Sequence, residues 1–430
     1  MVTTTTLCPA GRGPMTRRAP RSPFIQSNRI VIGVDIAKDD CVAVAQDGAG
    51  RLTKPLKFSM SQLGFTALDS FARSIVDSTG AEGFVVALEP TGHYGVPLVS
   101  RLVDDGVEVL KVEPLHTNRA KELFDGTRRK TDAKDAGLIA GLARQGVYRE
   151  YRLQRGVFAE LRVLGRRRQQ IVEQVSRTRN RLHRHLDETF PELAKLFHGK
   201  LTPTVLAILE VAPTPEDVLA LPFCELETTI RTGSRGQLGV ERARAVRAAA
   251  ENTIGTTDGL KAHRRAIGHL VEDMQHHRRQ CLEAERDMKA ALAEVPYAAN
   301  VLSIPRLGAI TLATLLGEFG DLRNFDRAEK LIKHTGLDLV ECSSGKRQGR
   351  RHISRRGRAY ARQMLFLAAL RVKVGRFGEA RMRLLERGKE PMVAAVANMS
   401  RLLRVIHALV RDGATFDAAH GGPVEVPLAA

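Results

Sequence analysis

The stretch RIVIGVD, Arg29 to Asp35, decides the fold, because a continuous apolar run that ends in an acid is typical of a buried strand. Two more strand-like segments, Cys41–Gln46 and Leu52–Phe58, follow at hairpin spacing with Asp- and Gly-rich turns between them. Apolar runs at Phe84–Leu88 and Val107–Val112 predict two further strands. The sequence therefore predicts a sheet that begins with three strands in a hairpin arrangement.

Helical segments separate the later strands. They are expected at Leu63–Val76, Tyr94–Leu102, His116–Leu123 and Asp132–Ala143. Alternating strands and helices place helices on the faces of a mixed sheet. This order matches the ribonuclease-H-like fold, so we predict an α/β domain of that class over residues 29–150.

The chain changes character after Tyr151, where two long helical segments carry apolar residues at helical spacing. This pattern favours an antiparallel coiled-coil arm over residues 151–293, with a small helical insert at Pro213–Gly255. A mainly α-helical domain is predicted over residues 294–412. Residues 1–28, which are basic, and 413–430 are predicted to be disordered tails, and Met15 is an alternative start to Met1. The two apolar stripes are Leu161, Leu164, Ile171, Val175, Leu182 and Leu186, and Ile267, Leu270, Met274, Cys281, Met288 and Leu292.

The bulk composition points to a polyanionic partner. Lys and Arg number 67 against 48 Asp and Glu, a formal net charge of +19. A basic membrane-surface protein is the competing interpretation, but we find no apolar run long enough to span a bilayer. With 5% aromatic residues and no Trp, phosphate contacts are expected rather than extensive base stacking. The five cysteines are scattered without a CxxC pair, which argues against a zinc site and a disulfide framework and fits a reducing cytoplasm.

Arginine is concentrated in the first long helix of the arm. Between Leu161 and Asp187 there are eight arginines and two acids. Such a run is often only a solvated helix face, but an imbalance of this size favours contact with nucleic acid. The candidate contacts are Arg166, Arg167, Arg168, Arg177, Arg181 and Arg184.

Four acids have the positions of a metal site. Asp35 and Glu89 each follow a buried strand, and Asp132 and Asp135 share one face at the start of a helix. Acids at the carboxyl ends of adjacent strands converge at one edge of a sheet, and their mutual repulsion favours hard divalent cations. Taken singly, each acid has an alternative interpretation as a turn former, a helix cap or a partner of the helix dipole.

The C-terminal domain has two segments that suit phosphate binding. Ile304–Ile310 resembles the hairpin of a helix-hairpin-helix element, although Arg306 stands where Gly is usual; the alternative is a plain helix–helix turn. Gly336–Arg362 is a basic, glycine-containing stretch in which a serine can act as a nucleophile or merely cap and bind phosphate. The candidate contacts in these segments are Arg306, Lys346, Arg350, Arg351, Ser354, Arg355 and Arg356.

Three motifs, GVDIAKD (33–39), EPTGHYGVPL (89–98) and KTDAKDA (130–136), resemble those of the DEDD transposases. These are insertion-sequence recombinases of the IS-one-ten group, which includes a pilin-gene DNA invertase. The Ser344-Gly345 pair is similar to the Ser-Gly motif of the family's C-terminal domain; Lys134 and Leu339 are departures from the usual pattern. The resemblance implies a RuvC-like catalytic domain in which Asp35, Glu89, Asp132 and Asp135 bind Mg²⁺, and a nucleophilic Ser344, adjacent to Ser343, that forms a covalent phosphoserine–DNA intermediate.

The resemblance also implies partners. It predicts donor and target DNA, a structured noncoding guide RNA and a homodimer that assembles into a tetramer, in the bacterial cytoplasm at the nucleoid, with no membrane. Four alternatives remain open: a site-specific DNA invertase of the same family, a RuvC-type junction nuclease without serine chemistry, a non-catalytic nucleic-acid-binding scaffold, and a degenerate, inactive copy.

Overall fold

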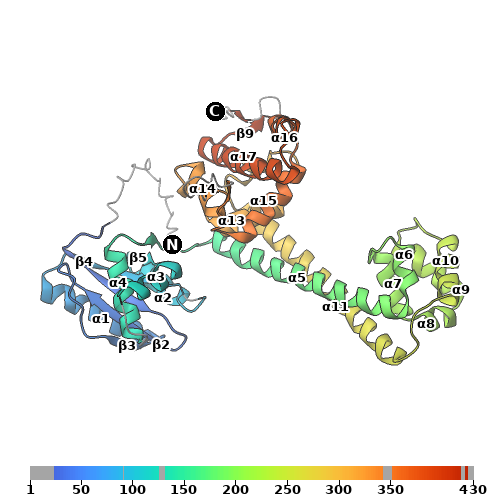
Figure 1. Cartoon of the computed structure of the whole chain (residues 1–430), viewed down its shortest axis with the longest axis horizontal. Helices are drawn as coiled ribbons and strands as arrows, with labels where there is room; N and C mark the ends of the chain where they lie inside the picture. Colours follow the sequence, from blue (N-terminus) through green and yellow to red (C-terminus); the bar gives the residue numbers. More distant parts are fainter. Residues whose placement is uncertain (1–23, 91, 125–130, 342–350, 418–421, 425–430) are drawn as a thin grey trace, which may run out of the picture. The chain divides into compact units, whose positions relative to one another are not determined.

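The computed structural model describes residues 24–90, 92–124, 131–341, 351–417 and 422–424 (Figure 1). The chain divides into two compact units, Met1–Leu153 and Gln154–Ala430. The first unit contains a six-stranded sheet, and the second contains the long helices. Each unit is described by itself.

The sheet of the first unit has the strand order β3-β2-β1-β4-β5-β6. β1 pairs antiparallel with β2 and parallel with β4, so the sheet is mixed, as the sequence predicts. The expected strand Leu52–Phe58 is shorter, because Leu52 makes only an isolated bridge to Gln46. The two-residue strand β6, which pairs with β5, was not predicted. The strands are β1 Arg29–Asp35, β2 Asp40–Gln46, β3 Leu56–Ser59, β4 Gly83–Leu88, β5 Val109–Lys111 and β6 Arg149–Glu150.

Helices cover both faces of this sheet, which explains why β1 reads as an unbroken apolar run rather than an alternating one. Ile30, Ile32 and Val34 pack against α1 and α2, whereas Val31 packs against α3 and α4 on the opposite face. Gly33 shares that second face, and a Cβ atom there would lie 2.0 Å from the Ala136 carbonyl oxygen. α4 therefore lies directly on β1. The helices are α1 Gln62–Thr79, α2 Val96–Asp104, α3 Pro114–Phe124 and α4 Asp132–Arg144.

The second unit contains the two predicted long helices, α5 Val157–Thr189 and α11 Leu260–Ala293, packed side by side (Figure 1). They run antiparallel, because Arg168 bonds to Glu285 near one end and His185 contacts His263 near the other. Leu161, Ile171, Leu182 and Leu186 of the first stripe are buried, as are Ile267, Met274 and Met288 of the second. The pairing is thus as predicted, while coiled-coil geometry stays a prediction.

The insert between these helices is larger than predicted. It contains α6 Pro191–Leu196, α7 Pro203–Val211, α8 Pro215–Ala220, α9 Phe223–Gly233 and α10 Val240–Glu251. Together with the adjoining ends of α5 and α11 it encloses a hydrophobic core of its own. The predicted start at Pro213 is too late, because Phe190 and Leu193 are already fully buried in that core.

The remainder of the second unit is mainly helical, as predicted. It contains α12 Ala298–Leu302, α13 Ala309–Phe319, α14 Ala328–Thr335, α15 Ala359–Arg371, α16 Arg376–Glu386 and α17 Pro391–Asp412, with a 3-10 turn Leu322–Asn324 and a short pairing of β7 Leu339–Val340 with β8 His352–Ile353.

α17 corrects one expectation, because it is the one helix of the described chain that is long and apolar enough to cross a membrane. Its apolar residues, including Leu402, Leu403 and Ile406, are however buried in the core that it shares with α13 and α15. A buried core helix passes the same test of length and composition, so this helix is weak evidence for a membrane span.

The predicted tails are also partly ordered. Ile25, which lies inside the predicted N-terminal tail, packs against the sheet core. At the other end, β9 Thr415–Asp417 pairs with β10 Gly422–Val424. Phe416 stacks on Phe377, with ring centroids 5.9 Å apart, and its N–H donates to the Ser303 hydroxyl. The prediction of disorder is wrong for Ile25 and for the strands around Phe416. It rested on composition, which does not reveal that Phe416 packs against Phe377.

Candidate active site

Strand register brings Asp35 and Glu89 together. In the parallel pair of β1 with β4, Val34 lies opposite Leu88. Asp35 and Glu89 are the next residues on the two chains, so they leave the sheet side by side at its carboxyl edge. Both are partly exposed, whereas the residues that precede them are buried. This is the edge at which the sequence predicts the acids to converge.

The start of α4 supplies the other two acids. The Thr131 hydroxyl caps the helix by accepting a hydrogen bond from the Lys134 N–H at 3.4 Å. Asp132 and Asp135 lie in the first turn, three residues apart and therefore on one face. Because α4 packs on β1 at Gly33, its first turn lies at the end of the strand that carries Asp35.

The electrostatics show that the four acids are neighbours. The pKa of Asp35 is raised to about 6, first by burial and then by the negative charges of Asp135, Asp132 and Glu89, in that order. Carboxylates that repel one another across a partly buried edge favour a bound cation, and carboxylate oxygens are ligands of hard divalent ions such as Mg²⁺. The donor type therefore suits a hard divalent ion, while Mg²⁺ binding at this edge stays a prediction.

Two residues of α3 complete the site and were not predicted from the sequence. The Thr117 hydroxyl donates to Glu89 Oε2 at 2.6 Å, and Lys121 Nζ lies 2.9 Å from Asp135 Oδ2. The positive charge of Lys121 also lowers the pKa of Asp35. Thr117 and Lys121 are four residues apart, so they share a helix face, but no sequence pattern reveals that this face lies against the acids.

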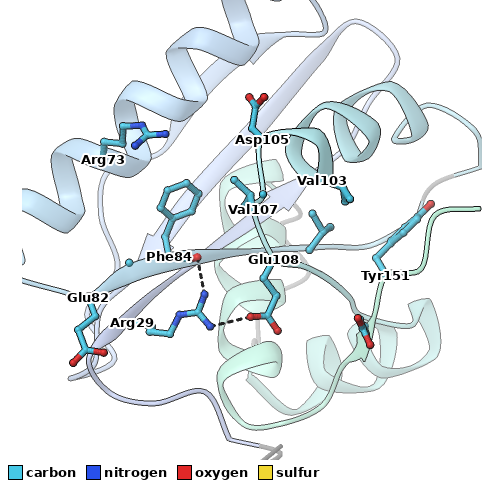
Figure 2. A pocket seen from close by; sticks show the side chains of 13 residues that line it. Arg29, Arg73, Glu82, Phe84, Val103, Asp105, Val107, Glu108 and Tyr151 are labelled. Carbon is cyan, nitrogen blue, oxygen red and sulfur yellow. Dashed lines mark hydrogen bonds and ion pairs between the residues drawn. The ribbon is translucent and has the colours of Figure 1, made fainter. Parts of the chain in front are cut away.

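A cavity of about 650 Å³ beside the sheet lies away from the acids. Figure 2 shows it beside Arg29 and Phe84, at the ends where β1 and β4 begin. Arg29 donates to the Phe84 carbonyl at 3.0 Å and forms an ion pair with Glu108 at 2.9 Å. Since its main charged groups pair with each other, this cavity gives no reason to move the site from the opposite edge.

The arginines of α5 divide into two groups. Arg166 holds the buried carboxylate of Glu318 through two nitrogens at 2.7 and 2.9 Å, and Arg168 bonds to Glu285 at 2.7 Å. These two expected nucleic-acid contacts are engaged inside the chain, because helices that approach from distant sequence bring acids that composition does not reveal. Among the others, Arg167 bonds to Gln280 and Arg184 to Glu188, and Arg177 and Arg181 are exposed.

The expected hairpin of the C-terminal domain lies between α12 and α13. Arg306 has φ +65°, in the left-handed region that favours glycine, at the position where the sequence comparison expects Gly. Gly308 then stands as the N-cap residue of α13. The backbone turn is therefore retained at Arg306, while its role in phosphate binding stays a prediction.

The basic segment after α14 is only partly described. Ser344, Ser343, Lys346 and Arg350 lie outside the described residues. Of the described contacts, the Ser354 hydroxyl donates to Asp338 and accepts from the Arg356 N–H, so it holds the backbone turn instead of being a free phosphate contact. Arg351 pairs with Glu341 at 2.8 Å, and Arg355 and Arg356 are exposed.

Comparisons with known proteins agree with this layout. A family model described as "Transposase" matches residues 32–191, and one described as "Transposase IS116/IS110/IS902 family" matches residues 298–385. Uncharacterized proteins of the insertion elements IS116 of Streptomyces clavuligerus and IS110 of Streptomyces coelicolor are 25% and 27% identical, over 91% and 92% of this chain and 97% and 98% of theirs.

Two shorter similarities complete the comparison. The pilin gene-inverting protein of Moraxella lacunata is 32% identical over 29% of this chain and 40% of its own length. The RuvC protein of T. thermophilus, solved with a Holliday junction substrate, is 15% identical over 29% of this chain and 99% of its own, with a TM-score of 0.22, too low to support an inference. The two family models, together with relatives that match over nine-tenths of its length, show that the chain belongs to the IS110 family of transposases.

Proposed function

We propose that this transposase cuts and rejoins DNA with two groups of residues, a Mg²⁺-binding tetrad of Asp35, Glu89, Asp132 and Asp135 and a nucleophilic serine, Ser344. The observation that carries the proposal is the register of β1 with β4, which sets Asp35 beside Glu89, together with the packing of α4 on β1, which brings Asp132 and Asp135 to the same edge. The raised pKa of Asp35 agrees with this placement. Four acids from three separate segments have no reason to be placed together for stability, because their mutual repulsion opposes folding.

Each residue of the acid edge has a distinct part. Asp35 and Glu89 are held by the sheet, and Asp132 and Asp135 by α4, so the ligands come from two rigid elements. Thr117 fixes one oxygen of Glu89, and Lys121 neutralises part of the charge on Asp135. When bound, Mg²⁺ supplies Lewis-acid activation of phosphate oxygens in the cleaved strand.

Ser344 is proposed as the nucleophile on the basis of the Ser344-Gly345 motif. Its hydroxyl oxygen would form a bond to the DNA phosphorus as the bond from phosphorus to a deoxyribose oxygen breaks, and that oxygen leaves with a proton. The exposed cations Arg355 and Arg356, on the same basic segment, suit the charge that builds on the phosphate. The proposed hydroxyl and the proposed metal site then act on one DNA strand.

The partners are those that the family resemblance implies: donor and target DNA, and a structured noncoding RNA that guides them. A net charge of +19 and the exposed Arg177 and Arg181 on α5 support binding to such polyanions. We propose a homodimer that assembles into a tetramer, with its place at the bacterial nucleoid in the cytoplasm. A discrete RNA that copurifies with the protein would support the guide, whereas random host transcripts alone would contradict it.

The serine is tested by trapping the covalent intermediate. Purified protein is incubated with Mg²⁺ and DNA that carries the ends of its own element, denatured, digested and mapped by mass spectrometry. We expect a nucleotide on Ser344, loss of the adduct with Ser344→Ala, and retention with the neighbouring control Ser343→Ala. An adduct on another residue would reject the assignment, and undiminished cleavage by Ser344→Ala would indicate a junction nuclease.

A site-specific DNA invertase is the second candidate, favoured by the 32% identity with the pilin gene-inverting protein. The two reactions share cleavage and exchange but differ in product. Sequencing of the products formed from a plasmid with two element ends distinguishes an inverted segment from an excised one.

A further inference from the structure

Three potential metal ligands meet where the arm joins the insert. His185 and Glu188 lie near the end of α5, and His263 lies in the first turn of α11, 78 residues from His185. The Nδ1 atoms of the two histidines are 3.0 Å apart, and His263 Nε2 is 3.7 Å from Glu188 Oε2. One ligand atom from each of the three residues lies within 4.8 Å of the others.

We propose that His185, Glu188 and His263 bind a transition-metal ion, with Zn²⁺ as the expected species, which joins the end of α5 to the start of α11. Two imidazoles with a carboxylate form a known ligand set for Zn²⁺, with water in the fourth position. Imidazole nitrogens favour Zn²⁺, Cu²⁺ and Ni²⁺ over Mg²⁺, so this site differs in chemistry from the acid edge of the sheet.

The geometry is close to that of a bound site. Zn–N bonds of 2.0 to 2.1 Å in a tetrahedron separate two ligand nitrogens by roughly 3.3 Å, which is near the 3.0 Å between the two Nδ1 atoms. Glu188 must rotate toward the two Nδ1 atoms, because its Oε2 lies 3.7 Å from His263 Nε2 and an ion held by the Nδ1 pair cannot use that nitrogen. Its side chain is 42% exposed, and Arg184 contacts the other carboxylate oxygen, Oε1, at 3.1 Å, so Oε2 is the oxygen that faces His263.

The position of the cluster indicates what the metal would do. Leu186, next to His185, and Ile267, one turn after His263, are both buried in the core of the insert. The Thr256 N–H donates to the Glu188 carbonyl at 2.9 Å, so the loop that returns to α11 also meets the end of α5 here. A metal at this point would hold the insert at a constant angle to the arm.

Metal binding is tested with the full-length protein after treatment with a chelator. Co²⁺ serves as the spectroscopic probe, because a tetrahedral site with nitrogen ligands has intense visible absorption, and Zn²⁺ is added in competition. All measurements use an Asp35→Asn/Asp132→Asn background, which weakens Co²⁺ binding at the acid edge. We expect one tetrahedral Co²⁺ per chain that Zn²⁺ displaces and excess Mg²⁺ does not.

Variants of the cluster decide the assignment. We expect His185→Ala and His263→Ala to weaken Zn²⁺ binding at least tenfold, and the milder Glu188→Gln to weaken it less. His183→Ala is the matched control, since His183 is a partly exposed histidine of the same helix outside the cluster. Circular dichroism establishes that each variant is folded. Unchanged affinity in His185→Ala and His263→Ala, or no tetrahedral Co²⁺ spectrum in the parent, overturns the proposal. DNA cleavage is not the readout, so either outcome leaves the proposed function standing.

Discussion

The acid edge of the sheet and the buried acid of the helical unit differ in how their negative charge is balanced. Glu318 in α13 is 2% exposed, but Arg166 binds both of its oxygens and Arg358 adds a second positive group at 3.9 Å. Asp35 is partly exposed, and its neighbours include three further acids against one lysine. The negative charge of the buried Glu318 is therefore neutralised by arginine, whereas the charge of the four acids around Asp35 is largely uncompensated.

This difference distinguishes structural from functional charge. A buried carboxylate paired with arginine costs little to keep but is expensive to break. A cluster of carboxylates lowers stability unless protonation, a nearby lysine or a bound cation balances its charge. Substitutions at the two places should therefore have opposite effects on activity and on stability.

The largest expected effect is on catalysis. Asp35→Asn or Glu89→Gln should lower strand cleavage by at least about a thousandfold, since each removes a charged oxygen ligand but keeps the shape of the side chain. Cleavage of labelled element-end DNA at saturating Mg²⁺ measures this. Glu113→Gln, a change to an acid near β5 that pairs with Lys111, is the control and should keep its activity. Near-normal cleavage by Asp35→Asn would remove the basis for the tetrad.

The next effect is on stability. Arg166→Met should lower the free energy of unfolding by about 3 to 5 kcal/mol, because the buried carboxylate of Glu318 is left without its main partner. The paired change Arg166→Met/Glu318→Leu should recover most of this loss, since it removes both charges. Denaturant unfolding followed by helical circular dichroism gives the comparison. An equal loss in the single and double variants would show that the ion pair is not the cause.

The smallest effect is the pH dependence of the acid edge without metal. The pKa of folded Asp35 is about 6, above its ordinary 3.8, so folding favours the protonated acid and stability is lost as pH rises from about 4 to 6. Asp35→Asn escapes this loss and should exceed the parent by roughly 1 kcal/mol at pH 7.5, a value reduced for solvent screening. The two should be nearly equal at pH 4.

Hydrogen exchange of β1 peptides in chelator measures this difference in the intact chain. Added Mg²⁺ should reduce the difference in protection between the parent and Asp35→Asn at pH 7.5, because the cation balances the negative charge of the acids. A parent that is more protected than Asp35→Asn at pH 7.5 in chelator would contradict the repulsion inferred for this edge.

Local sequence patterns predict the elements whose geometry depends only on neighbouring residues. The apolar run of β1, the strand that ends at Glu89 and the i, i+3 spacing of Asp132 and Asp135 together predict the sheet and the meeting of the acids. What could not be predicted depends on distant partners. Arg166 looks like a phosphate contact until Glu318 is placed beside it, and Lys121 lies at the acid edge only because α3 packs there.

The same limit applies to the histidine cluster. The cysteine pattern alone argues against zinc, whereas His185 and His263 become neighbours only when α11 returns along α5. The order near Phe416 depends likewise on Phe377, which lies 39 residues earlier in the chain. In each case the two residues meet through tertiary packing, and no periodic pattern in the sequence predicts the contact.

The absence of a side chain at Gly33 limits which substitutions this position can accept. With only hydrogen there, a helix backbone rests on a strand backbone, and the spacing between them sets how far Asp132 and Asp135 stand from Asp35 and Glu89. An added methyl group at Gly33 would push α4 away from β1 and so separate Asp132 and Asp135 from Asp35 and Glu89. Tolerance to mutation at Gly33 therefore depends on how closely α4 must lie on β1.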